Sequence, residues 1–207
     1  MNDGKRSLNL FFSKNTFKGS FNSFTEVPNK HLPECCFIGR SNVGKSSIIN
    51  AVTKSKKLAK TSKTPGRTQN INLFLINDKI NIIDLPGYGY AKISKIKRQE
   101  LSYLIKNYLI NRDNLKQVFV LIDCKVGLKD SDIDILDIIS ESDKQFSIIL
   151  TKVDKCATNF INKQKKSLLS LFKNYKSHFN NIFSSSSSKN IGIVDIQKEI
   201  FNLKKIS

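Results

Sequence analysis

The sequence has few residues of the kinds that bind zinc or build disulfide frameworks. It contains two histidines, His31 and His178, and four cysteines, none of them in a CxxC pair. Cys35 and Cys36 are adjacent within an apolar run, so we expect small buried side chains rather than metal ligands. A zinc site is therefore not expected, and free thiols are typical of a reducing compartment.

Long hydrophobic runs are also missing. No apolar segment approaches the ~18 residues that cross a bilayer, and we find no amphipathic anchor or lipidation signal. The short, broken apolar stretch Leu8–Phe12 does not resemble a signal peptide. We therefore expect a cytoplasmic protein without a membrane partner. The absence of a heptad pattern favours a monomer.

Acidic residues are scarce relative to basic ones. There are 17 Asp and Glu against 35 Lys and Arg, which gives a formal net charge of +18. Such an excess attracts polyanions such as RNA through counterion release. The alternative is that the chain is simply rich in Lys, Asn and Ile, without selection for binding. Charge alone leaves both explanations open.

From Glu34 onward, short apolar runs alternate with longer amphipathic segments, which is typical of an α/β sheet. The 207 residues fit one domain, which we place at residues 34–207, with an N-terminal extension, residues 1–33, packed on it. The expected strands are Cys35–Ile38, Ile71–Ile76, Ile80–Ile83, Val118–Ile122, Ser147–Leu150 and Asn181–Phe183. The expected helices are Lys45–Thr53, Lys95–Ile110, Ser131–Ser142, Asn159–Tyr175 and Ile193–Leu203. A hairpin-like turn at Asn77-Asp78 predicts one antiparallel edge strand, and the other strands should be parallel.

The segment from Gly39 to Ser46 matches the phosphate-binding pattern GxxxxGK[ST]. It follows an expected strand and opens an expected helix, the context that this pattern requires. Glycines let backbone N–H groups turn toward phosphates, Lys45 would reach the β- and γ-phosphates, and the Ser46 hydroxyl would bind Mg²⁺. The residues assigned to this loop are Gly39, Arg40, Ser41, Asn42, Val43, Gly44, Lys45, Ser46 and Ser47.

Two further motifs follow expected strands. Asp84-Leu85-Pro86-Gly87 is a DxxG motif, in which Asp84 would hold Mg²⁺ through water and the Gly87 amide would contact the γ-phosphate. By itself this sequence is also a good turn. Thr151-Lys152-Val153-Asp154 would place a carboxylate, Asp154, where it accepts hydrogen bonds from guanine N1–H and the 2-amino group. The alternative for Asp154 is a solvated helix-start residue.

The three motifs together indicate a GTPase, because a P-loop kinase or ATPase has no reason to carry TKxD on a later strand. The phosphate loop, the run Lys63-Thr64-Pro65-Gly66-Arg67-Thr68-Gln69 and the run Asp84 to Ala91 (Asp-Leu-Pro-Gly-Tyr-Gly-Tyr-Ala) resemble the EngB/YsxC family of bacterial ribosome-biogenesis GTPases. The resemblance covers roughly residues 20–205. It implies a three-layer Ras-like P-loop fold with a mixed six-stranded sheet, and a role in large-subunit assembly and cell division or septation.

The resemblance also assigns residues. Thr68 is expected to bind Mg²⁺, so the metal residues are Ser46, Thr68 and Asp84, and the residues expected to act in hydrolysis are Lys45, Thr68 and Gly87. The remaining assigned nucleotide contacts are Gly66, Arg67, Gln69, Asn70 and the guanine loop Phe183, Ser184, Ser185 and Ser186. Five consecutive serines leave the register of that loop open by one or two residues, and a flexible serine linker is the alternative.

The position that carries a water-orienting Gln in efficient GTPases is Tyr88, so we expect slow hydrolysis. Asn42 resembles the asparagine through which related GTPases hold K⁺, although it could merely satisfy a local turn. Basic residues cluster near the expected switches, at Lys54, Lys56, Lys57, Lys60, Lys63, Arg67, Lys92, Lys95, Lys97 and Arg98. By themselves these residues fit a solvated face and an RNA-binding face equally well. Together with the resemblance they favour a ribosomal RNA partner. The other functions considered are an RNA-binding module with a vestigial nucleotide site and a septation or membrane-associated regulatory GTPase.

Overall fold

The computed structural model describes residues 3–28, 31–60, 70–89, 94–175 and 177–205. Within these ranges, seven strands form one mixed sheet in the order β1-β3-β4-β2-β5-β6-β7. The strands are β1 (Asn15–Phe21), β2 (Glu34–Gly39), β3 (Ile71–Ile76), β4 (Ile80–Asp84), β5 (Leu115–Asp123), β6 (Gln145–Thr151) and β7 (Phe179–Ser184). Strand β3 is antiparallel to both of its neighbours, whereas the pairs from β4 through β7 are parallel.

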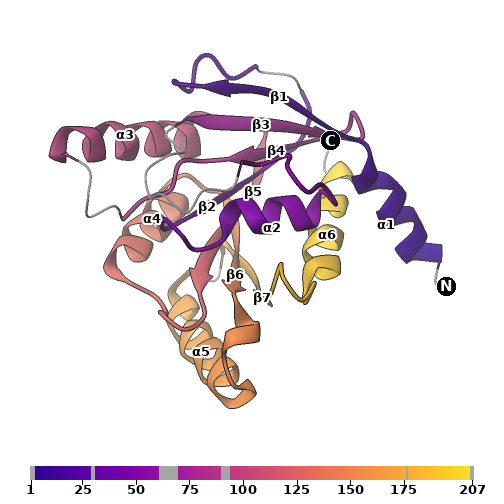
Figure 1. Ribbon diagram of the computed structural model, residues 1–207. Helices are drawn as coiled ribbons and strands as arrows, with labels where there is room; N and C mark the ends of the chain where they lie inside the picture. Colours follow the sequence, from indigo (N-terminus) through magenta and orange to yellow (C-terminus); the bar gives the residue numbers. More distant parts are fainter. Residues whose placement is uncertain (1–2, 29–30, 61–69, 90–93, 176, 206–207) are drawn as a thin grey trace.

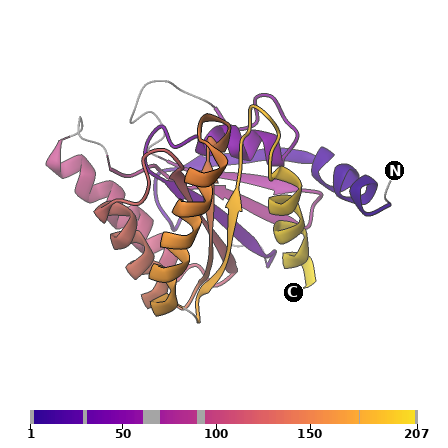
Figure 2. The same ribbon diagram turned by 90° about the horizontal axis from the view of Figure 1, so that it is seen from below.

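Helices cover both faces of this sheet (Figures 1 and 2). One face carries α3 (Lys95–Asn111), α4 (Asp130–Glu141) and α5 (Thr158–Leu171), and the other carries α1 (Asp3–Ser13), α2 (Lys45–Val52) and α6 (Ile193–Asn202). Short 3₁₀ segments lie at Val153–Lys155, Phe172–Tyr175 and Leu203–Lys205. This is the predicted three-layer α/β architecture. Across the described ranges, no helix is both long and apolar enough to span a bilayer.

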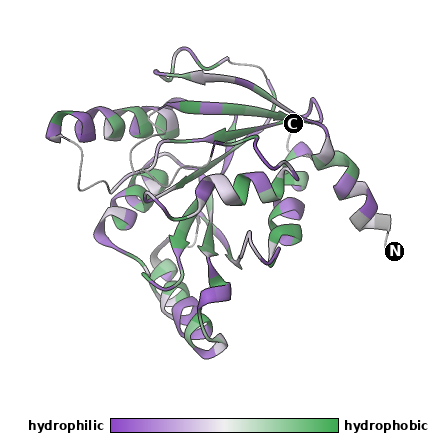
Figure 3. Ribbon diagram, viewed as in Figure 1, coloured by the Kyte–Doolittle hydropathy of each residue, from purple (hydrophilic) through white to green (hydrophobic). Residues whose placement is uncertain are grey.

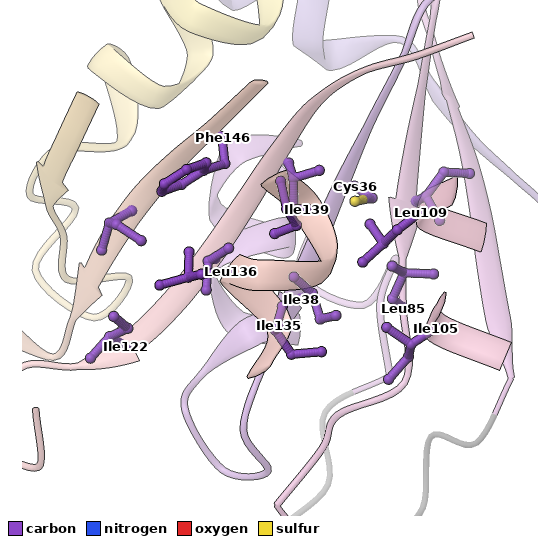
Figure 4. Packing of buried hydrophobic residues seen from close by; sticks show 14 of the residues in the cluster. Cys36, Ile38, Leu85, Ile105, Leu109, Ile122, Ile135, Leu136, Ile139 and Phe146 are labelled. Atoms are coloured by element: carbon purple, nitrogen blue, oxygen red, sulfur yellow. The ribbon is translucent and has the colours of Figure 1, made fainter. Parts of the chain in front are cut away.

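The central strands are buried on both faces, as expected of parallel strands covered by helices. Adjacent residues of β2 illustrate this, because Cys36 packs in the layer of α3 and α4 while Cys35 packs in the layer of α2 and α6. Figure 4 shows the first layer, in which Ile135 of α4 lies near Ile38 of β2 and Ile105 of α3 lies near Leu85. In Figure 3 the central strands are mostly green, whereas the helices carry both purple and green segments.

The six expected strands and five expected helices are confirmed, with ends shifted by a few residues. The expected strand count was wrong by one, because β1 adds a seventh strand beside β3. The antiparallel strand β3 therefore lies second from the edge rather than at the edge. Strand β1 gives little hydrophobic signal because it is an edge strand with a bulge between Phe17 and Gly19 and no fully buried side chain.

Helix α1 was also missed, although its sequence contains a signal. Leu8, Phe11 and Phe12 are buried and follow the i, i+3, i+4 spacing of an amphipathic helix. Their ring contacts tie α1 to the other end of the chain, since Phe11 packs edge-on against Phe201 of α6 with ring centroids 4.9 Å apart. The ammonium group of Lys204 lies 3.4 Å from the centroid of the Phe201 ring.

A buried ion pair lies at the start of β2, at the end of the sheet away from the phosphate loop. Glu34 and Arg112 form a two-pronged contact, with Nη2 to Oε1 at 2.7 Å and Nε to Oε2 at 2.8 Å. The Tyr108 hydroxyl donates to Glu34 Oε2 at 2.6 Å, and Asn81 Nδ2 donates to Oε1 at 3.0 Å. Burial and the Glu34 charge raise the pKa of Tyr108 well above its usual value, so it remains a donor.

Arg112 also holds the N-terminal segment. Its Nη1 donates to the carbonyl of Val27 at 3.2 Å and its Nη2 to the carbonyl of Pro28 at 2.7 Å. The pair therefore joins three parts of the molecule: strand β2, the end of α3 and the chain that leads from β1 into β2.

Candidate nucleotide-binding site

The polar motifs meet at one edge of the sheet because the strands that they follow are parallel. The phosphate loop follows β2, Asp84 ends β4, Asp123 ends β5, Thr151 ends β6 and Ser184 ends β7. The carboxyl ends of parallel strands lie on the same side of a sheet, where ligands bind in open α/β folds. Three motifs that are far apart in the sequence thus line one site.

The loop between β2 and α2 has the backbone conformation that phosphate binding requires. A Cβ atom at Gly39 would lie 2.9 Å from the carbonyl oxygen of Leu121, so no side chain fits there. Gly44 has a φ of 101°, and Asn42 has a φ of 61°. Helix α2 begins at Lys45, so its first N–H groups face the loop, and Ser46 and Ser47 lie half-buried in its first turn.

The two charges expected to hold phosphate and Mg²⁺ are in direct contact. Lys45 Nζ contacts Asp84 Oδ1, and both side chains are buried. Asn72 of β3 donates from Nδ2 to Asp84 Oδ2 at 3.4 Å. An ammonium group for the phosphates and a carboxylate for the metal fit a magnesium nucleotide, which would replace this ion pair by giving each charge a new partner.

The rest of the DxxG motif is buried. Leu85 lies in the hydrophobic core and donates its N–H to the carbonyl of Phe37 at 3.1 Å, so it continues the contact between β4 and β2. Pro86 and Gly87 follow it and are also buried. The side chain of Leu85 therefore packs in the core, and Asp84 is the residue of this motif whose side chain reaches Lys45.

The TKxD motif is tied to the phosphate loop. Thr151 Oγ1 donates to the carbonyl of Val43 at 2.7 Å, and Lys152 Nζ donates to the carbonyl of Asn42 at 2.7 Å. Lys152 also pairs with Asp123 Oδ2 at 2.9 Å. The phosphate-binding and base-binding segments are thereby held in a fixed relation. Val153, by contrast, is buried in the core and offers no side chain to a ligand.

Asp123 was not identified from the sequence, although its place at the end of β5 was an available signal. Burial opposes its ionisation, but the hydrogen bond and charge of Lys152 and the N–H groups of Lys125 and Val126 outweigh burial and lower its pKa. The ionised carboxylate holds the ammonium group of Lys152 beside the phosphate loop.

Asp154 is exposed and lies against the serine-rich loop. The Ser188 hydroxyl donates to its Oδ2 at 3.4 Å. A hydrogen bond from Ser186 is the main cause of the lowered pKa of Asp154, with smaller contributions from its own backbone N–H and from Ser188, against the opposing effect of burial. The carboxyl group is therefore ionised at neutral pH and offers acceptors only, as recognition of guanine requires.

The serine loop is ordered by the protein itself rather than acting as a linker. Ser185 donates its N–H to the carbonyl of Leu150 at 2.8 Å, and Ser186 donates its N–H to the carbonyl of Ile191 at 3.1 Å. Phe183 is a core side chain packed near Phe119. The amides of Ser185 and Ser186 therefore both have acceptors within the protein.

Arg40 points away from the loop that contains it. Its Nη2 donates to the carbonyl of Gly127 at 2.9 Å, and its Nε lies 3.2 Å from Oδ2 of the buried Asp132 in α4. Tyr88, directly after the DxxG motif, donates its hydroxyl to the other oxygen of Asp132 at 2.7 Å. Asp132 was not identified from the sequence, because it stands among several acidic residues of α4 and nothing local distinguishes it.

Several assigned residues fall outside the described ranges. They are Gly66, Arg67, Thr68 and Gln69. Asn70 is described and lies half-buried directly before β3. Among the residues that the structure does describe, no group of three or more His, Cys, Asp or Glu side chains gathers as a metal site. The magnesium site expected here differs from such a cluster, since it combines one carboxylate with hydroxyl groups and phosphates.

Comparison with known proteins agrees with this geometry. Residues 34–152 match the family model described as 50S ribosome-binding GTPase. The chain is 40% identical over 177 residues to the probable GTP-binding protein EngB of Caulobacter vibrioides (strain NA1000 / CB15N), covering 86% of this chain and 77% of that protein. It belongs to the EngB family. The EngB protein of Anaplasma marginale (strain Florida) is 39% identical and covers 91% of this chain and 92% of its own length.

Solved structures agree on the fold. A crystal structure of a probable EngB protein matches 84% of this chain and 100% of its own, with a TM-score of 0.63 and 23% identity. Era, solved in complex with MgGDPNP and a segment of 16S ribosomal RNA, matches 83% of this chain and 56% of its own, with a TM-score of 0.65 and 20% identity. The chain is thus a P-loop GTPase of the EngB family that binds guanine nucleotide.

Proposed function

We propose that this EngB-family protein is a GTP-dependent assembly factor of the large ribosomal subunit, needed for normal cell division or septation. The observation that carries the proposal is the meeting of the phosphate loop, Asp84 and Asp154 at one sheet edge in a strongly basic chain. The family description, 50S ribosome-binding GTPase, supports it, as does the fold shared with Era, which was solved with ribosomal RNA. On this proposal the protein acts as a cytoplasmic monomer, and residues 1–33 are an extension of a GTPase domain at 34–207.

The nucleotide roles follow from the site. The phosphate-loop N–H groups and Lys45 hold the phosphates, Asp154 holds guanine, and Gly87 contacts the γ-phosphate. Ser46 and Asp84, with Thr68 assigned by the resemblance, would hold Mg²⁺, whose charge would offset that of the β- and γ-phosphates. Since the amides of Ser185 and Ser186 are already bonded, we assign the contact with guanine O6 to the Ser187 amide.

Hydrolysis by the isolated protein should be slow and faster in K⁺ than in Na⁺. Tyr88 stands where a water-orienting Gln would, and Asn42 stands beside the phosphates, where a bound cation could replace a missing arginine. We expect a single-turnover rate of about 10⁻⁴ to 10⁻² s⁻¹, by analogy with unassisted GTPases. Single-turnover assays in KCl and NaCl at equal ionic strength measure both effects. A rate near 1 s⁻¹ without a partner contradicts the first, and equal rates in the two salts remove the role of K⁺.

The ribosomal role predicts nucleotide-dependent binding. Co-sedimentation with separated subunits, in GDP and in a non-hydrolysable GTP analogue, should show analogue-dependent binding to the large subunit that persists at physiological salt. Binding that ignores the nucleotide and falls steeply with salt would instead reflect net charge alone. In that case the GTPase assignment stands and the ribosomal role does not.

Charge reversal on two helices sharpens this experiment. Lys95→Glu with Lys97→Glu changes α3, which begins shortly after the DxxG motif, whereas Lys163→Glu with Lys166→Glu changes α5 at the other side of the same layer (Figure 2). Both double variants remove the same charge. If the basic residues near the switches, which include Lys95 and Lys97, bind ribosomal RNA in the GTP state, the α3 variant loses analogue-dependent binding. The α5 variant then retains most of it. Equal losses of binding in the two variants indicate that binding depends on the net charge of the protein rather than on α3.

A further inference from the structure

The residue that follows the DxxG motif is bonded through its backbone to the phosphate loop and through its side chain to α4. Tyr88 donates its N–H to the carbonyl of Gly39 at 3.4 Å and accepts from the N–H of Ser41 at 3.1 Å. This pairing forms a short parallel bridge between Tyr88 and Arg40. The Tyr88 hydroxyl donates to Asp132 Oδ1 at 2.7 Å. Backbone and side chain therefore fix the same residue from two directions.

Asp132 is a strong anchor because its carboxylate is ionic, buried and fully engaged. Its side chain has no exposed surface, and Oδ2 accepts the N–H of Lys129 at 2.8 Å. Arg40 Nε lies 3.2 Å from the same oxygen and supplies the compensating charge. Hydrogen bonds to a buried ionised group are stronger than those between neutral groups. Burial and Asp132 together raise the pKa of Tyr88 well above its usual value, so its hydroxyl keeps the proton that it donates.

This arrangement competes with recognition of a γ-phosphate. The N–H of Ser41 belongs to the loop that would cradle the phosphates, and here it is bonded to the Tyr88 carbonyl. Lys45, which would reach the γ-phosphate, contacts Asp84. Gly87 immediately precedes Tyr88 along the chain, so the bonds of Tyr88 restrain its movement toward a γ-phosphate. GDP has no γ-phosphate, so binding of GDP does not require Gly87 to move.

We propose that Asp132 is a positioning residue for γ-phosphate recognition, which holds Tyr88 on the phosphate loop in the arrangement that favours GDP. GTP must break the contact between Tyr88 and Asp132 to draw the Gly87 amide to its γ-phosphate. The strength of this contact then sets how well the protein discriminates GTP from GDP. This inference rests on the γ-phosphate contact proposed for Gly87.

The test compares affinities for GDP and for a non-hydrolysable GTP analogue by isothermal titration calorimetry. Tyr88→Phe removes only the hydroxyl group, so we expect the ratio of analogue affinity to GDP affinity to rise about tenfold over the wild type, as loss of one hydrogen bond to a charged group implies. A side chain that only fills space would change both affinities equally. An unchanged ratio overturns the proposal.

A matched control is a second tyrosine whose hydroxyl group donates to an aspartate of α4. Tyr175 donates its hydroxyl to Asp137 Oδ1 of α4 at 2.6 Å, a bond of the same type that does not involve the phosphate loop. Tyr175→Phe should leave the affinity ratio unchanged, and a similar shift in this variant counts against the proposal. Failure of the wild type to bind either nucleotide would refute the proposed site itself, which is a separate result.

A second variant tests whether the effect of Tyr88→Phe arises from altered packing around the ring rather than from loss of the hydrogen bond. Asp132→Asn keeps the shape of the acceptor but removes its charge, and the ratio should again move toward the GTP analogue. Because both substitutions weaken one contact, the double variant should show a shift smaller than the sum of the single shifts. Additive shifts mean that the two residues act independently and overturn the inference. Thermal unfolding of each variant confirms that the proteins compared are folded.

Discussion

Asp154→Asn should lower the affinity for GTP and GDP by about 10⁴-fold and improve binding of xanthosine nucleotides. A carboxylate accepts hydrogen bonds from both guanine N1–H and the 2-amino group, whereas an asparagine offers one acceptor and one donor. The donor would face the 2-amino group and leave both unpaired, and a site built around such a pair rejects the wrong partner by about this factor. Xanthine has a carbonyl at that position, which can accept from the new amide. Competition between GDP and XDP in a calorimetric titration measures both changes.

The matched control for this substitution is Asp195→Asn. Asp195 lies on α6, its side chain is 62% exposed, and the change removes the same charge. Its nucleotide affinities should equal those of the wild type. If Asp154→Asn also left the preference for guanine intact, the Thr151–Asp154 motif would not be the base-recognition element, and the assignment of the serine loop beside it would fail as well.

Glu34→Gln should cause the largest loss of stability among single changes outside the site. The substitution leaves Arg112 buried with no compensating charge, and breaking a buried ion pair in this way costs about 3–5 kcal/mol. For a domain of this size such a loss lowers the melting temperature by roughly 10 °C. Thermal unfolding followed by circular dichroism measures it. The effect should extend to the segment near Val27 and Pro28, because Arg112 holds both of their carbonyl groups.

An exposed ion pair of α3 provides the comparison. Lys97 and Glu100 lie 3.0 Å apart with side chains 40% and 57% exposed. Glu100→Gln should shift the melting temperature by no more than about 2 °C, because such surface pairs contribute little. A joint replacement, Glu34→Leu with Arg112→Met, should be less harmful than Glu34→Gln, since it leaves no charge uncompensated. If Glu34→Gln were as mild as Glu100→Gln, the buried pair would not be a main support of the fold.

The parts of the site that could be predicted are those formed by short motifs of consecutive residues. The phosphate loop, Asp84 and Asp154 each follow an apolar run, and the order of these runs was sufficient to bring them to one edge. The central strands were found for the same reason, since strands buried on both faces have continuous apolar sequences.

Contacts between distant residues could not be predicted in this way. Nothing near Asp132 distinguishes it from Asp130 or Asp134, and its role depends on Arg40 and Tyr88, which reach it only in the folded sheet. Asp123 likewise depends on Lys152, which directly follows β6. The register within five identical serines was open for a related reason, because the bonds of their amides are made in the folded chain, by Ser185 to Leu150 of β6 and by Ser186 to Ile191.

The packing of α1 against α6 has a consequence for synthesis of the chain. Residues of α1 leave the ribosome well before Phe201 and the rest of α6. Domains fold as units during translation only when the partners of each element have emerged. The apolar side of α1, with Leu8, Phe11 and Phe12, therefore lacks its partner until α6 has been translated, and the docking of α1 on α6 is a late step in the folding of this domain.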